Sequence, residues 1–456
     1  MFKRILIANR GEIALRVMRA AKAMGIESVA IYSEADVEAP HRVEADVAVC
    51  VGGPKSADSY LNIEAILQAA EQTEAKAIHP GYGFLSENAL FSELCAQHKI
   101  TFIGPGPRVI RLMGDKATAR RTMQAAGLPV IPGSEGVLAG LDEATEVASD
   151  MGFPVLLKAT AGGGGKGMRI CRDLGALGVS FAQAAMEADK AFGNPGLYME
   201  KYIERGRHIE FQFMADSFGN AVHLGERECS AQRNHQKLIE ESPSAVMTAE
   251  LRAELGDKVR KAVAAIGYVG AGTMEFLRDP SGKLYFMEVN TRLQVEHPVT
   301  EMVTGFDLVQ EQIRVAANHR LSMRQEDVRL QGHAIEVRVN AEDPFDGFKP
   351  CPGLVSRFEP PAAADGVRVR VDTYVRDGTR IPVYYDSMIC KLIVAAETRD
   401  QARRGMIEAL GKFRVEGIKT TIPLHLKILA SEAFASGTYD TGLVGGLLAQ
   451  ERPAGN

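Results

Sequence analysis

The sequence predicts a mixed α/β architecture in which a parallel α/β region comes first and a largely antiparallel sheet comes last. Three observations support this expectation. Strand and helix patterns alternate over residues 1–105, glycines separate two strand-like segments within residues 153–172, and alternating strands follow one another from residue 204 onward. Alternating strands and helices are typical of a parallel sheet covered on both faces, whereas strands with few helices between them favour antiparallel pairing.

The N-terminal region contains the segments that predict the parallel sheet. Strands are expected at residues 5–8, 28–32, 47–51, 75–78 and 101–103. Helices with apolar residues at helical spacing are expected at residues 12–24, 63–70 and 87–97. The Gly-Pro-Gly-Pro segment at residues 104–107 ends this region, because neither residue type continues a regular element.

A small α/β subdomain is expected over residues 130–203, after a helix at residues 115–126 that opens with Lys116. Its expected elements are helices at 142–151 and 174–190, strands at 153–157 and 168–171, and a closing strand with the sequence L-Y-M-E-K-Y-I.

The loop between the two middle strands has the composition of an anion-binding segment. It contains Gly162, Gly163, Gly164, Gly165, Lys166 and Gly167, and Lys158 lies shortly before it. Glycines let backbone N–H groups approach an anion closely, and the lysines add positive charge. The loop is not a Walker A motif, because no Ser or Thr follows Lys166, and no G-x-G-x-x-G follows the first strand. A flexible glycine-rich lid is expected, with a mobile surface hairpin as the alternative.

The last part of the chain contains a predicted β-hairpin that carries metal-ligand chemistry. Strands are expected at residues 208–214, 221–226, 273–277, 284–289 and 333–340. The Asp-Pro-Ser-Gly turn at residues 279–282 lies between two apolar runs that contain Glu275, Glu288 and Asn290. Buried carboxylates need a positive partner, and carboxylate and amide oxygens suit Mg²⁺ carrying nucleotide phosphates. A structural ion pair with Lys or Arg is the alternative.

Composition and charge exclude several classes of protein. The 456 residues suffice for two or three domains, and a net charge of −5 with mixed signs leaves no basic footprint for nucleic acid. No apolar run approaches the length of a membrane span. The six cysteines are scattered without a C-x-x-C pair, which fits a reducing cytosol and neither a disulfide scaffold nor a zinc site. We therefore expect a cytoplasmic protein that binds neither nucleic acid nor membrane.

Eight segments together resemble the biotin carboxylase family of ATP-grasp ligases over nearly the whole chain. They are H-P-G-Y-G-F-L-S-E-N (79–88), K-A-T-A-G-G-G-G-K-G-M (158–168), R-H-I-E (207–210), E-C-S-A-Q-R-N-H-Q-K-L-I-E-E-S-P (228–243), M-E-F-L (274–277), M-E-V-N-T-R-L-Q-V-E-H-P-V-T-E (287–301), G-H-A-I-E-V-R (332–338) and Y-Y-D-S-M-I-C-K-L-I (384–393). The glycine run alone would be weak, whereas the 287–301 segment is highly specific.

This resemblance implies an ATP-grasp fold with three parts and a defined reaction. The parts are an N-terminal α/β domain at 1–115, an ATP-grasp part at 116–203 that includes the lid at about 130–203, and a region at 204–449 with the C-terminal part of the ATP-grasp fold and the C-terminal domain of the family. ATP phosphorylates bicarbonate to carboxyphosphate, whose CO₂ is transferred to N1′ of biotin, which gives carboxybiotin, ADP and phosphate. This is the first half-reaction of an acetyl-CoA or acyl-CoA carboxylase or, alternatively, of a pyruvate-type carboxylase that acts on a 2-oxo acid.

The resemblance also implies a nucleotide site. The residues that it assigns to ATP are Lys116, Lys158, Gly163, Gly164, Gly165, Lys166, Gly167, Met168, Glu200, Lys201, His208, Gln232, His235 and Leu277. The two lysines at 116 and 158 would neutralise phosphates, the hinge at 200–201 would offer one main-chain donor and one acceptor to adenine, and Glu275, Glu288 and Asn290 would coordinate Mg²⁺ or Mn²⁺.

For bicarbonate and biotin, the resemblance assigns residues to separate tasks. Lys237 and Arg292 supply positive charge to bicarbonate, and Arg suits planar bidentate recognition. The remaining residues are Gln294 and the Val295 backbone as hydrogen-bonding groups, Glu296 as general base, Arg338 as the group that stabilises the biotin enolate, and Tyr82 and Gly83 as neighbours of the ureido ring.

Several other residues receive structural interpretations. His79 and His297 are expected to have structural roles, Arg10 and Glu12 to form a salt bridge, and residues 384–387 to form a packing corner. Arg19 is equally compatible with a solvated helix face and with the homodimer surface of the family. Asn234 occupies a position where the family usually has a second Arg, which puts any contact of that guanidinium in doubt.

The expected partners and competing functions follow from the same resemblance. The chain has no Met-Lys-Met biotin-attachment site, so biotin is expected in trans on a carrier protein or domain, with a carboxyltransferase subunit as a further partner and a homodimer as the assembly. A carboxylate–amine ligase of the ATP-grasp type is the alternative enzyme class, and Glu296 and Arg338 argue against it. A nucleotide-binding regulatory subunit is disfavoured because the metal and bicarbonate positions are intact.

Overall fold

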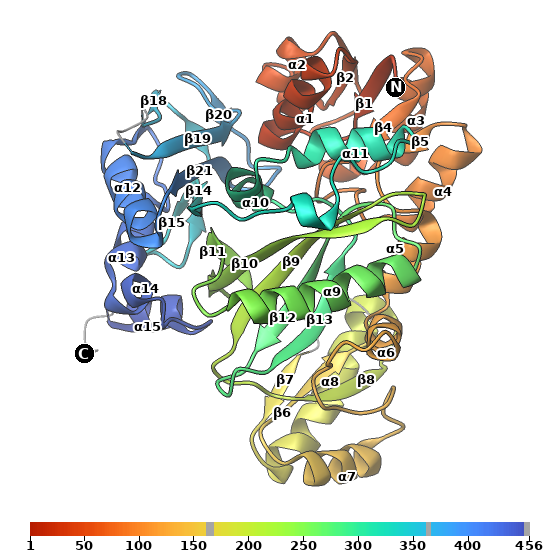
Figure 1. Cartoon of the computed structure of the whole chain (residues 1–456), viewed down its shortest axis with the longest axis vertical. Helices are drawn as coiled ribbons and strands as arrows, with labels where there is room; N and C mark the ends of the chain where they lie inside the picture. Colours follow the sequence, from red (N-terminus) through yellow and green to blue (C-terminus); the bar gives the residue numbers. More distant parts are fainter. Residues whose placement is uncertain (161–167, 362–365, 451–456) are drawn as a thin grey trace.

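The computed structural model describes residues 1–160, 168–361 and 366–450, and it divides the chain into four spatial regions (Figure 1). The N-terminal α/β region lies at one end, the small subdomain projects at the opposite end, and a large sheet lies between them. The C-terminal helices pack against interior strands of this sheet. Within the described ranges, no helix is long and apolar enough to cross a membrane.

The N-terminal region is the parallel α/β unit that the sequence predicts. Five of the described strands pair in the order β3-β2-β1-β4-β5, and every pair is parallel. The strands are β1 Arg4–Ile7, β2 Glu27–Tyr32, β3 Val47–Cys50, β4 Ala77–His79 and β5 Thr101–Phe102. The helices are α1 Gly11–Ala23, α2 Pro40–Glu44, α3 Ile63–Gln72 and α4 Ala89–Gln97. Strands β1 and β2 are buried almost throughout, as expected for a sheet covered on both faces.

Two helices connect this region to the small subdomain. Helix α5 (Pro107–Gly114) starts with Pro at its first turn, and α6 (Lys116–Ala125) is capped by Asp115, whose side chain accepts from the N–H of Thr118. The subdomain contains α7 Leu141–Met151, β6 Val155–Ala159, β7 Arg169–Cys171, α8 Leu174–Phe192 and β8 Leu197–Lys201. Its strands pair antiparallel in the order β7-β6-β8, with their own small core.

A single sheet extends through the rest of the molecule. Eight described strands pair in the order β13-β12-β9-β10-β11-β14-β21-β19, and all pairs are antiparallel. The strands are β9 Arg207–Ala215, β10 Ala221–Arg233, β11 Gln236–Ser242, β12 Gly270–Arg278, β13 Leu284–Asn290, β14 His333–Asn340, β19 Arg368–Thr373 and β21 Met388–Ala396. The antiparallel prediction is therefore confirmed, and the turn at 279–282 joins β12 to β13.

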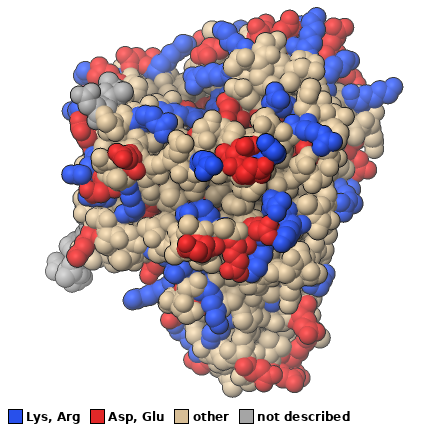
Figure 2. Space-filling model, in the orientation of Figure 1, with Lys and Arg blue, Asp and Glu red and all other residues tan. Residues whose placement is uncertain are grey.

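Helices are more frequent in this part than the sequence led us to expect. The helices are α9 Ala249–Ala265, α10 His297–Thr304, α11 Leu308–Ala316, α12 Arg399–Lys412, α13 Ile422–Ala430, α14 Glu432–Ser436 and α15 Leu443–Gln450. The short strands are β15 Glu342–Asp343, β16 Lys349–Pro350, β17 Gly353–Leu354, β18 Arg357–Glu359, β20 Arg380–Ile381 and β22 Arg414–Glu416, and they pair outside the large sheet. On the face of the molecule shown in Figure 2, Lys, Arg, Asp and Glu are interspersed, as the mixed composition predicts.

Candidate functional site

Lys237 lies at the centre of a buried ionic cluster. From β11, its Nζ atom lies 2.6 Å from Glu210 on β9, 3.0 Å from Glu275 on β12 and 2.6 Å from Glu296, which precedes α10. The side chain of Lys237 is 11% exposed, and all three carboxylates are buried. Charges interact strongly where water is largely excluded, and one ammonium cannot neutralise three carboxylates. The cluster therefore requires further positive charge.

The register of the large sheet explains why carboxylates meet here. Glu288, Glu275 and Glu210 are direct cross-strand partners on β13, β12 and β9, and Arg227 on β10 continues the row. Side chains directly opposite one another share a face of the sheet, and like charges in such positions repel. The row therefore gains stability from cations, which can be protein side chains or a bound ion.

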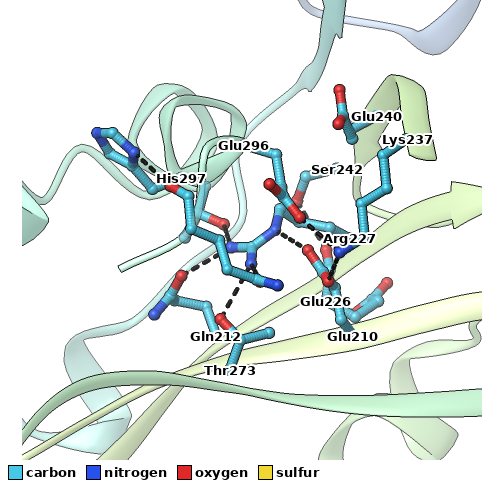
Figure 3. Close-up of polar contacts among 12 residues, drawn as sticks. Glu210, Gln212, Glu226, Arg227, Lys237, Glu240, Ser242, Thr273, Glu296 and His297 are labelled. Carbon is cyan, nitrogen blue, oxygen red and sulfur yellow. Dashed lines mark hydrogen bonds and ion pairs between the residues drawn. The ribbon is translucent and has the colours of Figure 1, made fainter. Parts of the chain in front are cut away.

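Arg227, which sequence reasoning did not single out, connects the cluster to its surroundings. Its side chain is fully buried, and Figure 3 shows its guanidinium among acceptors from several elements. The acceptors are Glu210, Gln212, Thr273, Gln294 and Thr300, at distances of 2.6 to 3.1 Å. A signal was available in the sequence, because an arginine that stands between two glutamates must find several acceptors if it is buried.

The contact with Arg227 also determines how the Gln294 amide is oriented. Nη2 of Arg227 donates to Oε1 of Gln294 at 2.7 Å. The amide nitrogen of Gln294 therefore points the other way and donates to Oε1 of Glu275 at 2.9 Å. Gln294 thus presents its N–H group toward the carboxylate row.

Arg338 on β14 completes the cluster on the side away from the row. Its Nη2 atom donates to Oε2 of Glu296 at 2.8 Å, and its Nε atom donates to Oε1 of Glu240 on β11 at 2.6 Å. The other oxygen of Glu296 accepts from Lys237 at 2.6 Å. The resemblance assigned Lys237 to bicarbonate and Arg338 to the biotin enolate. In the structure both side chains contact the same carboxylate, that of Glu296.

The electrostatics of Glu296 follow from these two contacts. Burial alone would raise its pKa, but Lys237 and Arg338 outweigh burial and hold the pKa of Glu296 well below its ordinary value. Burial would lower the pKa of Lys237, but the charges of Glu210, Glu275 and Glu296 outweigh burial and raise it well above its ordinary value. Glu296 is therefore ionised and is a weak base for as long as both cations contact it.

The residues expected to bind a metal ion lie together at one end of the row. Nδ2 of Asn290 donates to Oε1 of Glu275 at 2.9 Å, and Glu275 is opposite Glu288. Glu275 also pairs with Lys237 and lies 3.1 Å from Nε2 of His208, so the ion pair that was the alternative expectation is present. Burial, and then the charge of Glu275, raise the pKa of Glu288. A carboxylate in that state is short of positive charge, so this donor set fits a hard divalent cation.

Arg292 is connected to the N-terminal region by a residue that sequence reasoning missed. Its Nε atom donates to Oε2 of Glu87 at 2.9 Å, and its Nη2 atom donates to Oδ1 of Asn290 at 3.2 Å. Oε1 of Glu87 also accepts from the N–H of Thr291 at 2.9 Å. Glu87 belongs to the 79–88 segment, so its position in that segment was the available signal. It places Arg292 beside the expected metal ligands.

The two lysines expected at the phosphates come from two elements, and both interact electrostatically with Glu288. Lys116 begins α6 and lines a pocket of about 210 Å³ together with Glu87, Glu288 and Asn290. Lys158 on β6 forms an ion pair with Glu200 on β8. Glu200 raises the pKa of Lys158 although burial opposes it, so the ammonium stays charged. A polyanion can therefore meet positive charge from two elements.

The remaining side chains assigned to ATP come from β9, β10, β12 and the turn after β10. His208 and Leu277 are direct partners on β9 and β12. His235 lies at the exposed tip of the β10–β11 hairpin, where burial, and then the positive charges of His208, Lys158 and Lys116, lower its pKa. Gln232 is buried on β10 opposite Lys237.

The hinge expectation needs one correction. The N–H of Lys201 donates to the carbonyl of Pro132 at 2.8 Å, and that of Tyr202 donates to the carbonyl of Pro154 at 3.1 Å. A main-chain donor for adenine therefore cannot come from Lys201. The Nζ atom of Lys201 donates to the carbonyls of Gly152 and Phe153, each at 3.0 Å.

The glycine-rich loop lies outside the described residues. Gly163, Gly164, Gly165, Lys166 and Gly167 fall within the range 161–167 and remain predictions. Met168 is the first described residue after this range, directly before β7.

The expected neighbours of the ureido ring lie near Glu296. The Tyr82 ring lies 5.8 Å from Nζ of Lys391, and that ammonium donates to the carbonyl of Val295 at 2.9 Å. The carbonyl of Val295 is therefore already engaged, which leaves its N–H as the group that could meet bicarbonate. Gly83 is exposed directly after Tyr82. Lys391, which is fully buried on β21, holds this segment in place.

Among the residues interpreted as structural, one pair was wrong. Arg10 does not pair with Glu12. It pairs with Asp36 at 2.6 Å, and Glu12 lies 3.3 Å from Nζ of Lys391. The two side chains leave the start of α1 toward different elements, which a sequence spacing of two does not reveal.

The other structural interpretations agree with the contacts observed. Nδ1 of His79 accepts from the N–H of Gly81 at 3.0 Å, and the His79 side chain is fully buried. His297 is buried at the start of α10, with its Nδ1 atom 2.8 Å from the carbonyl of Gln294. Tyr385 packs over Arg10 at 4.3 Å, as expected for a packing corner.

Comparisons with known proteins cover nearly the whole chain. Three family models match consecutive segments: biotin carboxylase, N-terminal domain at 1–110, carbamoyl-phosphate synthase L chain, ATP binding domain at 115–324, and biotin carboxylase C-terminal domain at 336–445. Biotin carboxylase 1 of Bacillus subtilis is 54% identical over 444 residues, which are 97% of this chain and 98% of that protein.

Solved structures give the same result. The biotin carboxylase–β,γ-ATP complex from Campylobacter jejuni has a TM-score of 0.94 at 50% identity, over 98% of this chain and 99% of that one. The biotin carboxylase domain dimer of Hydrogenobacter thermophilus 2-oxoglutarate carboxylase, in complex with MgADP, ADP and bicarbonate, has a TM-score of 0.93 at 50% identity, over 98% of both chains.

Proposed function

Because this chain belongs to the biotin carboxylase family and catalyses the ATP-dependent carboxylation of biotin, we propose that the cluster of Lys237, Glu296 and Arg338 is its catalytic site. The observation that carries this proposal is the convergence of Lys237 and Arg338 on the two oxygens of Glu296. One base is thus placed between a cation suited to bicarbonate and a cation suited to an enolate.

The first step is the activation of bicarbonate. The anion is held by Lys237, by Arg292 and by the N–H groups of Gln294 and Val295. Lys237 then interacts with bicarbonate as well as with Glu296, so its stabilisation of the Glu296 carboxylate weakens. The pKa of Glu296 then rises toward the range of a useful base. Glu296 takes the bicarbonate proton, and the freed oxygen attacks the γ-phosphorus of ATP, which breaks the bond to ADP and forms carboxyphosphate.

The second step is the carboxylation of biotin. Carboxyphosphate separates into CO₂ and a phosphate anion, the phosphate takes the proton from N1′ of biotin, and N1′ then bonds to CO₂. Arg338 stabilises the negative charge that develops on the ureido oxygen, as preplaced donors do for other oxyanions. Tyr82 and Gly83 are proposed to lie beside the ureido ring.

A divalent cation held by Glu275, Glu288 and Asn290 would offset phosphate charge and orient the γ-phosphate when it is bound. Lys116 and Lys158 would neutralise the remaining phosphate charge. His208, Gln232, His235 and Leu277 would contact the nucleoside, together with the hinge at Glu200 and Lys201. Lys201 cannot provide a free main-chain N–H.

The partners follow from the reaction. Biotin is proposed to arrive on a carrier protein or domain, and the chain is proposed to act as a homodimer, as in the dimeric neighbour. A carboxyltransferase is proposed as the component that uses carboxybiotin. The acceptor is an acyl-CoA or a 2-oxo acid, and co-purification of the carboxyltransferase distinguishes the two. The scattered cysteines support a reducing cytosol as the location.

The proposal is tested by measuring ATP cleavage with bicarbonate and free biotin varied separately. We expect cleavage that depends on bicarbonate and rises when biotin is added, with carboxybiotin as product. Phosphate release that does not respond to bicarbonate would remove the assignment, and formation of an amide product from an added amine would favour the carboxylate–amine ligase.

A further inference from the structure

Glu240 is the second anchor of Arg338. The guanidinium is held from two sides, by Glu296 at its Nη2 atom and by Glu240 at its Nε atom, with distances of 2.8 and 2.6 Å. Glu240 is fully buried on β11, the strand next to β14. Figure 3 shows its carboxylate apart from the hydrogen-bonded group around Arg227.

A second carboxyl group lies directly opposite Glu240. The register pairs Glu240 on β11 with Glu336 on β14, and both side chains are fully buried. Two ionised carboxylates in such positions repel, so one member of the pair must carry a proton. Neither oxygen of Glu336 has a hydrogen-bond partner among the described residues, whereas Oε1 of Glu240 accepts from Arg338. Burial raises the pKa of Glu336 well above its ordinary value. Burial also raises the pKa of Glu240, to about 7, but its contact with Arg338 opposes this rise. The proton therefore resides on Glu336, which has no such contact, and Glu240 is the member of the pair that carries the negative charge.

This division matters because the two anchors of Arg338 behave differently during the reaction. Glu296 loses its negative charge when it takes a proton from bicarbonate, and its attraction for Arg338 weakens at that moment. Glu240 has no such exchange with a reactant and keeps its charge. A guanidinium held only by Glu296 would be free to turn when biotin reacts.

We propose, on the basis of the function proposed above, that Glu240 is the positioning residue that holds Arg338 in place while Glu296 changes its protonation state. Glu240 does not touch the reactants. It acts through Nε of Arg338. Glu336, which lies opposite Glu240, is neutral and therefore does not repel the negative charge of Glu240.

The test compares Glu240→Gln with the wild-type chain in two assays. Loss of one charged hydrogen bond to Arg338 should slow carboxybiotin formation by roughly 10- to 100-fold, through kcat more than through KM for biotin. Bicarbonate-dependent ATP cleavage without biotin should stay within about threefold, because the Lys237–Glu296 contact remains. Glu240→Asp, which keeps the charge, should recover part of the carboxylation rate.

Glu336→Gln is the matched control, because Glu336 is equally buried and lies opposite Glu240 but does not hydrogen-bond to Arg338 among the described contacts. It replaces a neutral carboxyl with a neutral amide and should leave both activities unchanged. Equal losses in both assays for Glu240→Gln, or equal effects of Glu240→Gln and Glu336→Gln, would overturn the positioning assignment. A wild-type chain without biotin-dependent turnover would instead remove the underlying function, and this assignment with it.

Discussion

At the scale of single residues, the site consists of charges that neutralise one another until reactants enter. Sequence motifs identified Lys237, Glu296 and Arg338, because each lies in a distinctive segment. They did not identify Arg227 or Glu240, because those contacts depend on strand register. Strand β10 carries irregularities between Glu228 and Gln232, and a shift of one residue would move each side chain to the other face.

Arg338→Gln should uncouple the two half-reactions. A guanidinium about 4 Å from a developing negative charge contributes on the order of 4 kcal/mol at an effective dielectric constant near 20, which corresponds to roughly a 10³-fold slower carboxylation of biotin. ATP cleavage without biotin should survive much better, because it depends on Lys237 and Glu296. Parallel assays of phosphate and carboxybiotin measure the effect.

Glu296→Ala is the reference variant for that experiment and should lose both activities together. If Arg338→Gln abolished biotin-independent ATP cleavage as completely as Glu296→Ala, Arg338 would belong to the bicarbonate or nucleotide site.

Glu288→Gln should raise the Mg²⁺ concentration needed for half-maximal activity by on the order of tenfold, equivalent to about 1.4 kcal/mol of binding. The change removes an anionic oxygen from Glu288, a half-buried carboxylate opposite Glu275 whose pKa is raised by burial and by the charge of Glu275. Mg²⁺ titrations of ATP cleavage measure the shift, with Glu288→Asp as the variant that keeps the charge. Superimposable titration curves for Glu288→Gln and wild type would favour a purely structural role.

At the scale of elements, turns and strand ends decide details that motifs leave open. Asn234 and His235 form the two-residue turn between β10 and β11, with φ angles of 48° and 67°. Positive φ at both central residues defines the hairpin turn in which Asn is favoured. Asn234 therefore has a backbone reason for occupying a position where the family usually has Arg. The sequence predicted most element positions, but it missed α9 to α11. Helices α10 and α11 are short, with 8 and 9 residues, and the buried face of the 17-residue α9 is narrow and consists mostly of small residues.

Glu241 on β11 connects the sheet to the C-terminal helices. It accepts from Arg399 at 2.7 and 3.0 Å and from the Tyr439 hydroxyl at 2.7 Å, and it lies 2.8 Å from Nε2 of His333. Burial would raise its pKa, but His333 and Arg399 outweigh burial and lower the pKa to about 2, from 4.5. A carboxylate whose pKa is depressed in the folded state stabilises the fold above the unfolded pKa and loses that effect as pH falls.

Glu241→Gln should therefore lower the free energy of unfolding at pH 7 by about 3 kcal/mol. The difference from wild type should shrink between about pH 4.5 and pH 2, where the wild-type carboxylate becomes protonated. Urea unfolding at pH 7 and at pH 3 measures both effects, with Glu38→Gln on the surface as control. A difference that did not change with pH would show that packing, and not charge, stabilises this contact.

At the scale of the whole molecule, α1 is the element that connects the N-terminal region to the rest. Its buried face carries Arg16, which donates to Glu301 and Asp307 at 2.7 Å each, while Arg19 is exposed. Sequence reasoning left Arg19 equally compatible with a solvated face and with a dimer surface. Its exposure fits both interpretations, because a dimer surface is exposed in a single chain.

Arg19→Glu should weaken the proposed homodimer. At a symmetric interface, a group on the other subunit that complements the positive charge of Arg19 would repel a glutamate at this position. Sedimentation at several protein concentrations should show a dissociation constant raised by at least about tenfold, or about 1.4 kcal/mol. Lys22→Glu, an exposed position three residues further along α1, is the comparison variant. Unchanged sedimentation of Arg19→Glu would assign Arg19 to the solvated face.

The single antiparallel sheet has a consequence for how the chain can be divided. The match to the C-terminal family model begins at residue 336, inside β14, which pairs with β11 on one side and β21 on the other. A chain cut near residue 324 would lack β14. The backbone N–H and carbonyl groups of β11, the strand that bears Glu240 and Glu241, would then be free to pair with a strand of another molecule. Such a fragment should aggregate and not fold as an autonomous nucleotide-binding module. The boundary of a sequence family model therefore need not coincide with the boundary of a unit that folds cooperatively.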